Sequence, residues 1–131
     1  MDAAAPVDGE EVKEIFDSTG PAAKVVRKIL ERHVQSSSVK WWLAECKRRG
    51  RAGWARKFSS PAQRSVPDYL FSATQGPCLH DEHIFAVEFK APGKTSTDAQ
   101  LDEQQKMRDA GWDVYECDSV EKFKEIARRY L

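Results

Sequence analysis

The segment from Ile84 to Lys90 places the strongest constraint on the fold, because its pattern is that of a β-strand. Side chains alternate between the two faces of a strand. One face would carry Phe85, Val87 and Phe89. The other would carry Ile84, Ala86, Glu88 and Lys90. Because Ala91-Pro92-Gly93 ends the strand, we expect a sheet that shows an apolar face and, on its other face, two opposite charges at one end.

The rest of the chain alternates between helical and strand-like patterns. A helical stretch begins after Pro21, and the serine run 36–38 either breaks it or caps the next helix. The other expected helices are 10–17, 39–49, 98–110 and 119–130, and the other expected strands are 54–58, 69–73 and 112–117. This order predicts an α/β domain with a central mixed sheet flanked by helices, preceded by extra N-terminal helices.

The charges are segregated along the 131 residues, although they sum to zero. Residues 1–20 hold six acids and one base, residues 21–66 hold twelve bases and two acids, and residues 67–131 hold thirteen acids and eight bases. The basic third is either a solvated helix and loop or a face that binds a polyanion.

Other features exclude several classes of protein. No apolar run approaches the ~20 residues of a membrane span, and the acidic start differs from a signal peptide, so we expect a cytoplasmic protein with no membrane partner and no organic cofactor. Cys46, Cys78 and Cys117 are scattered, which favours reduced structural thiols over disulfides or zinc. The segment His80-Asp81-Glu82-His83 is either a transition-metal site or, as its composition favours, a solvated loop.

Glu88, Lys90 and Asp68 are the candidates for chemistry. A simple Glu88–Lys90 ion pair would contribute only ~0–1 kcal/mol to the stability of the fold if it were exposed. It would not explain Asp68, which opens another expected strand. Two carboxylates from neighbouring strand ends suit Mg²⁺ or Mn²⁺, and a lysine beside them suits hydrolysis of a phosphodiester.

Several motifs in this order resemble the VRR-NUC family of the PD-(D/E)xK nuclease superfamily. They are Arg64-Ser65-Val66-Pro67-Asp68, the Glu88-x-Lys90 strand continuing to Lys94, Gln100, and Gly111-Trp112-Asp113-Val114. The resemblance covers about residues 39–121. It implies a PD-(D/E)xK restriction-endonuclease-like core in residues 36–131, with residues 1–35 forming an acidic tail and helical extension.

The resemblance also implies roles for these residues. Asp68 and Glu88 would hold Mg²⁺ or Mn²⁺ together with the backbone carbonyl of Phe89, Lys90 would be the catalytic lysine, and Gln100 would orient the site. The implied activity is that of a structure-specific endodeoxyribonuclease, such as a Holliday-junction resolvase. Stand-alone members of the family act as homodimers and include phage proteins that work in a bacterial host.

One departure from the family concerns a glutamate in the helix before the first strand, where this chain has Gln35-Ser36-Ser37-Ser38. Glu31 is the candidate substitute, because it shares a helical face with Gln35 if the helix continues through the serines. The alternatives are a weakened nuclease fold that only binds branched DNA, and an adaptor whose acidic tail docks a partner or covers the basic face.

The basic third supplies the expected DNA contacts. They are Arg48, Arg49, Arg51, Arg56, Lys57, Arg64 and, beyond it, Lys94. Phosphate contacts carry no sequence information, so we expect recognition of DNA shape. Trp41 or Trp54 would stack on an exposed base, whereas Trp42 and Trp112 are expected in the core.

Overall fold

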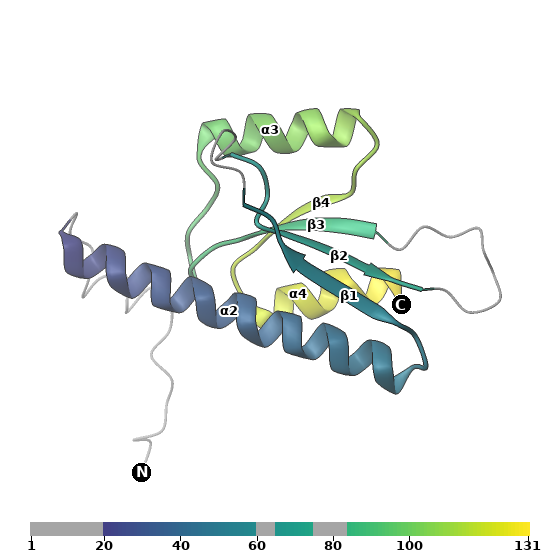
Figure 1. Cartoon of the computed structure of the whole chain (residues 1–131). Helices are drawn as coiled ribbons and strands as arrows, with labels where there is room; N and C mark the ends of the chain where they lie inside the picture. The colour runs from purple at the N-terminus through teal and green to yellow at the C-terminus, as the bar shows by residue number, and fades with distance from the viewer. Residues whose placement is uncertain (1–19, 60–64, 75–83) are drawn as a thin grey trace, which may run out of the picture.

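The computed structural model describes residues 20–59, 65–74 and 84–131 (Figure 1). The elements are α2 (Pro21–Arg48), β1 (Gly53–Lys57), β2 (Tyr69–Ala73), β3 (Ile84–Phe89), α3 (Asp98–Asp109), β4 (Val114–Cys117), α4 (Val120–Ala127) and the 3₁₀ turn η1 (Arg128–Tyr130). The expected helix at 10–17, Arg64, Cys78 and the 80–83 segment lie outside the described residues. All four expected strands are present in the predicted order.

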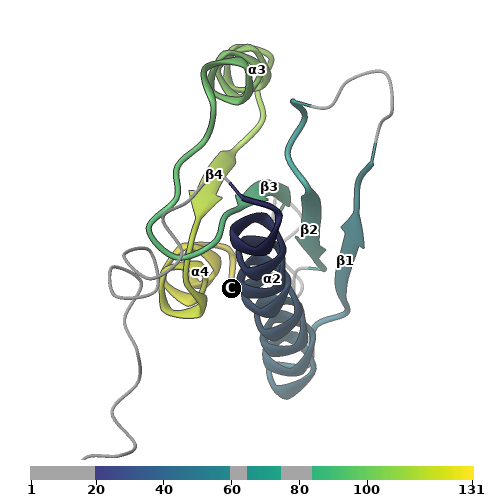
Figure 2. The ribbon, with the colours of Figure 1, turned by 90° about the vertical axis from the view of Figure 1, so that its left-hand side faces the viewer.

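The four strands form one mixed sheet in the order β1-β2-β3-β4. β2 pairs antiparallel with both β1 and β3, whereas β3 and β4 are parallel and are joined through α3. Figures 1 and 2 show α2 and α4 against one face of the sheet and α3 on the opposite side. The predicted α/β class with a mixed, helix-flanked sheet is therefore confirmed.

Aromatic side chains fill the space between the sheet and the helices α2 and α4. Phe71 of β2 stacks on Phe85 of β3 with ring centroids 5.1 Å apart, and Trp42 of α2 meets Phe85 edge-to-face at 5.3 Å. Phe123 of α4 closes the layer against Phe71 at 4.9 Å. Phe85, Val87 and Phe89 are fully buried, so the apolar face that the alternation predicted is the core face.

α2 is a single 28-residue helix that runs through the serine run without a break. Serine disfavours a helix by only about 0.5 kcal/mol per residue, and packing on both sides of the run outweighs this cost. Val34 lies before the run, Trp42 and Cys46 lie after it, and all three are buried. The expected boundary between residues 35 and 36 therefore falls inside one helix. In the described parts of the chain, no helix is apolar over the length that crossing a membrane requires.

The expectation for Trp112 was wrong, although Trp42 is fully buried as predicted. β4 begins only at Val114, and Trp112 belongs to the turn that ends α3. Its amide donates to the carbonyl of Met107 at 3.0 Å, and Gly111 has a φ of 99°, a left-handed conformation that favours glycine. This turn leaves the Trp112 side chain 39% exposed.

Candidate active site

The register of β2 and β3 brings Asp68 beside Glu88. The ladder ends where Tyr69, the first residue of β2, pairs with Val87, so the next residues beyond this end are Asp68 on one chain segment and Glu88 on the other. The Phe89 amide, which follows Glu88 directly, donates to Asp68 Oδ2 at 3.3 Å. Residues opposite each other in such a pair have Cβ atoms about 4.5–5.5 Å apart and point to the same face. The two predicted carboxylates therefore converge from neighbouring strands, at the end of β3.

Burial makes this pair electrostatically costly. Glu88 is only 3% exposed, and loss of solvation together with the negative charge of Asp68 raises the pKa of Glu88 to about 8, against the opposing effect of Lys90. Burial also raises the pKa of Asp68, partly offset by the Phe89 amide and by Lys57 and Lys90. Among the described residues, Glu88 Oε2 has no hydrogen-bond partner. The site thus contains a buried carboxylate oxygen to which no described residue donates a hydrogen bond.

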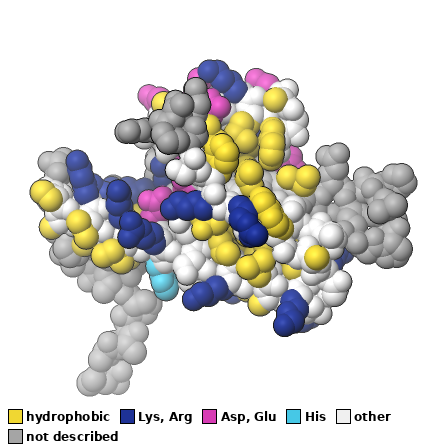
Figure 3. Space-filling view, in the orientation of Figure 1, with side chains coloured by type: hydrophobic (Ala, Val, Ile, Leu, Met, Phe, Trp, Pro, Cys, Tyr) yellow, Lys and Arg dark blue, Asp and Glu magenta, His cyan; other side chains and the backbone are white. Residues whose placement is uncertain are grey.

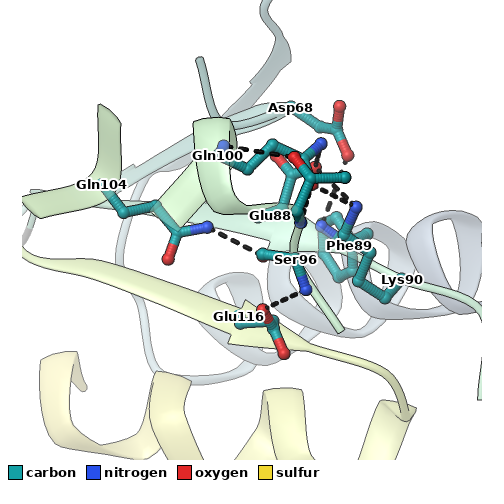
Figure 4. A network of polar contacts seen from close by, with 9 residues as sticks. Asp68, Glu88, Phe89, Lys90, Ser96, Gln100, Gln104 and Glu116 are labelled. Carbon is teal, nitrogen blue, oxygen red and sulfur yellow. Dashed lines mark hydrogen bonds and ion pairs between the residues drawn. The ribbon is translucent and has the colours of Figure 1, made fainter. Parts of the chain in front are cut away.

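Gln100 connects Glu88 to Lys90 (Figure 4). Its Nε2 donates to Glu88 Oε1 at 2.9 Å, and its Oε1 accepts from Lys90 Nζ at 2.6 Å. Lys90 Nζ lies 3.5 Å from the same Glu88 oxygen. Gln100 is itself fixed as the third residue of α3, where it and Thr97 form reciprocal capping hydrogen bonds. The start of α3 therefore fixes the orientation of both charged side chains.

A second set of contacts holds the loop between β3 and α3. The Ser96 amide donates to Glu116 Oε2 at 2.8 Å, and Gln104 Nε2 donates to Ser96 Oγ at 2.9 Å (Figure 4). Glu116 lies opposite Glu88 in the β3–β4 register, and this contact gives its carboxylate a donor. Ser96, Gln104 and Glu116 were not anticipated, since a single serine or glutamine in a loop or helix gives no periodic signal.

Glu31 faces the same site from α2, because the helix continues through the serines. Burial and the charge of Asp68 raise the pKa of Glu31, whereas Lys90 and Lys57 lower it. The charge of Glu31 in turn contributes to the raised pKa of Glu88. Glu31 also lines a cavity together with Lys90, and its role as a substitute for the missing glutamate stays a prediction.

The donor set fits a hard divalent cation that keeps much of its water. Within the residues that the structure describes, no cluster of three or more His, Cys, Asp or Glu side chains forms a ready-made metal cage. Mg²⁺ is commonly held by one or two carboxylates, with water and substrate phosphate completing its shell. Asp68 and Glu88 supply such a pair, and the unsatisfied Glu88 oxygen is a free ligand atom.

The basic residues divide into those near the carboxylates and those far from them. Lys57 influences the pKa of both Asp68 and Glu31, and Lys94 lines a cavity together with Lys90. Arg48 and Arg49 instead pair with Glu45 at the other end of α2, about 25 Å from Glu31 at the usual helical rise. Arg51 is half-buried, and Arg56 lies over the ring of Trp54, which is exposed.

Three basic residues near the site were missed. Lys24, Arg27 and Lys28 line the same cavity as Glu31 and Lys90. Their spacing with Glu31 places all four on one helical face, a signal that was present in the sequence. On the same helix Val25 and Ile29 are exposed, although apolar residues at helical spacing are expected to face the core.

The raised pKa of Glu88 predicts a pH-dependent stability in metal-free protein. The folded state holds this proton more tightly than the unfolded chain, so the stability linked to it is complete below pH 4.5, the ordinary pKa, and is lost as the pH rises through about 8. Glu88→Gln removes this dependence. In thermal unfolding with EDTA, the Tm of the wild type should therefore fall relative to that of Glu88→Gln across this range.

Glu121→Gln, at an exposed position of α4, is the matched control and should follow the wild type at every pH. If the Glu88→Gln and wild-type curves stay parallel from acid to alkaline pH, the Glu88 carboxyl is not strained by burial.

Comparison with known proteins supports the fold. No protein family matches the sequence, and no curated protein matches it. A solved structure described as a VRR_NUC domain superposes with a TM-score of 0.57 and 24% sequence identity, covering 77% of this chain and 97% of that chain. The resemblance inferred from the motifs is thus supported by an independent comparison of structures. The chain has the fold of a VRR_NUC domain.

Proposed function

We propose that this protein is a metal-dependent, structure-specific endonuclease of the VRR-NUC family that hydrolyses phosphodiester bonds in branched DNA. The observation that carries the proposal is the pair formed by half-buried Asp68 and buried Glu88, with an unsatisfied Glu88 oxygen and Lys90 beside it. The shared fold agrees with it, as do the motifs of residues 64–114. A Holliday junction is the first substrate to test.

Asp68, Glu88 and the carbonyl of Phe89 would hold Mg²⁺ or Mn²⁺, and Glu31 would complete the shell through water. The chemistry that such an ion supplies when bound is polarisation of the phosphate and acidification of an attacking water. Binding would also neutralise the repulsion between the two carboxylates. The energetic cost of burying this pair in the free protein is consistent with a site built for a cation.

Lys90 is proposed to act on the reacting phosphate. In hydrolysis, water adds to phosphorus, the bond from phosphorus to the leaving sugar oxygen breaks, and that oxygen takes up a proton. The Lys90 ammonium, held by Gln100 Oε1, would donate to the attacking water or to the phosphate oxygen that gains charge. Gln100 is a positioning residue, since it fixes both Lys90 and Glu88.

Two further parts of the proposal concern assembly and substrate shape. Symmetrical cutting of two strands at a junction needs two sites related by a two-fold axis, so the active form would be a homodimer. The cations near the site offer contacts to phosphate rather than to base edges, which favours recognition of DNA shape. The expected cytoplasmic location and a phage origin stay predictions.

Lys90→Ala should lower the rate of cutting strongly while preserving the fold and DNA binding. The measurement is cleavage of a labelled four-way junction with Mn²⁺, in which the wild type should make paired cuts in two strands. Removing one charge-stabilising donor should lower the rate about 100- to 1,000-fold. Binding with Ca²⁺, measured by fluorescence anisotropy, should stay within about threefold.

Lys106→Ala, which removes an exposed lysine paired with Asp102 on α3, should cleave like the wild type. Equal loss of binding and cutting in Lys90→Ala would assign Lys90 to phosphate contact rather than to chemistry. Binding of the junction by the wild type without cleavage in Mg²⁺ or Mn²⁺ would refute the nuclease and leave the binding module.

Glu31→Gln should weaken Mn²⁺ binding about tenfold, measured from the loss of the free-ion signal in electron paramagnetic resonance. Glu45→Gln is a stringent control, because it alters a glutamate of the same helix that is tied to Arg48 and Arg49. Its Mn²⁺ affinity should equal that of the wild type. Identical affinities in all three proteins would remove Glu31 from the proposed metal site.

A further inference from the structure

A cavity of about 280 Å³ lies between the N-terminal half of α2 and the loop that follows β3. Its charged lining consists of Lys24, Arg27, Lys28 and Glu31 from α2, with Lys90 and Lys94 from the other side. Figure 3 shows the dark blue basic side chains gathered over this part of α2, beside acidic ones. Five cations and one carboxylate thus face a single hollow, which is smaller than a typical site for an organic ligand.

Within the part of the chain that the structure describes, the cations of α2 that line the cavity have no ion-pair partner. Lys24, Arg27 and Lys28 recur at helical spacing, so they project from one face of the helix. Neither these three nor Lys94 forms an ion pair with any described residue. By contrast, Arg48 and Arg49 of the same helix are occupied by Glu45. The positive charges that line the cavity repel one another, and a bound anion would reduce that repulsion.

We propose that this cavity holds the phosphate next to the scissile one in the bound DNA strand. The inference rests on the proposed function. The cavity adjoins the candidate active site, because Glu31 and Lys90 line the cavity and also lie near Asp68 and Glu88. When the reacting phosphate of a DNA strand lies at the carboxylates, the neighbouring phosphate of that strand must lie on one side of them. The side that forms the cavity carries the cations.

The ligand is a backbone phosphate rather than a base. Lysine and arginine side chains without an exposed aromatic partner contact phosphates, and the cavity lining contains no aromatic residue. This contact would be independent of sequence and would set the register of the strand against the catalytic groups. Lys24, Arg27 and Lys28 are therefore assigned as DNA-positioning residues.

The test compares Lys24→Ala/Lys28→Ala with Lys40→Ala/Lys47→Ala, which removes two exposed lysines of α2 outside the cavity. Binding to a four-way junction is measured with Ca²⁺ as a function of KCl concentration. Each lost phosphate contact lowers the slope of log K against log salt by about one. The cavity variant should lose about two units of slope and at least tenfold in affinity, whereas the control should stay close to the wild type.

A second arm locates the contact by placing one uncharged methylphosphonate at successive positions of the junction strand. For the wild type, the substitution beside the cleavage position should weaken binding, and for the cavity variant the same substitution should have no further effect. Equal effects in both proteins at every position, or a variant slope equal to that of the control, would overturn the inference.

Failure of this inference differs visibly from failure of the proposed function. Cleavage of the junction by the wild type, with unchanged salt dependence in the cavity variant, rejects only the phosphate pocket. If the wild type never cleaves, the nuclease proposal fails, while scanning the whole strand with methylphosphonates still shows whether Lys24 and Lys28 contact one particular phosphate.

Discussion

The antiparallel pairing of β2 with β3 places two carboxylates opposite each other at a buried end of the sheet, and the surrounding structure is organised around that repulsion. Pro67 is buried and fixes the chain just before Asp68, while Phe85, Val87 and Phe89 hold β3 in the core. A one-residue slip of β3 would move Glu88 to the core face and an aromatic ring to the site. The aromatic core therefore determines the position of the acidic pair as well as the stability of the sheet.

The polar groups around Asp68 and Glu88 offset only part of the negative charge of this pair. Lys90 reaches Glu88 Oε1 only, and Gln100 donates to the same oxygen, so the second oxygen stays without a partner among the described residues. Glu31 adds a third negative charge from a different element. A purely structural ion pair would be expected to satisfy both oxygens. The imbalance is better explained by a site that gains its last positive charge from outside the chain.

Local patterns predicted the sheet and most of the site. The alternation of 84–90 fixed which side chains face the core, and the motif order pointed to Asp68, Glu88, Lys90 and Gln100, which the structure brings together. Features that depend on distant packing were harder to predict. The serine run was a possible helix break on its local pattern alone. The helix continues because Val34 before the run and Trp42 after it are both buried in the core. The ion pairs of Arg48 and Arg49 with Glu45, by contrast, follow the i,i+3 and i,i+4 spacing of a helix, so the sequence did carry a local signal for them.

We propose that Asp68 and Glu88 share one divalent cation. The most direct measurement is anomalous diffraction from crystals soaked in Mn²⁺. We expect a peak about 2 Å from an oxygen of each carboxylate and from the carbonyl of Phe89, with Glu88 Oε2 among the ligands. A structure with no ion between the two carboxylates at saturating Mn²⁺, or with Glu88 Oε2 bonded to a side chain instead, would contradict it.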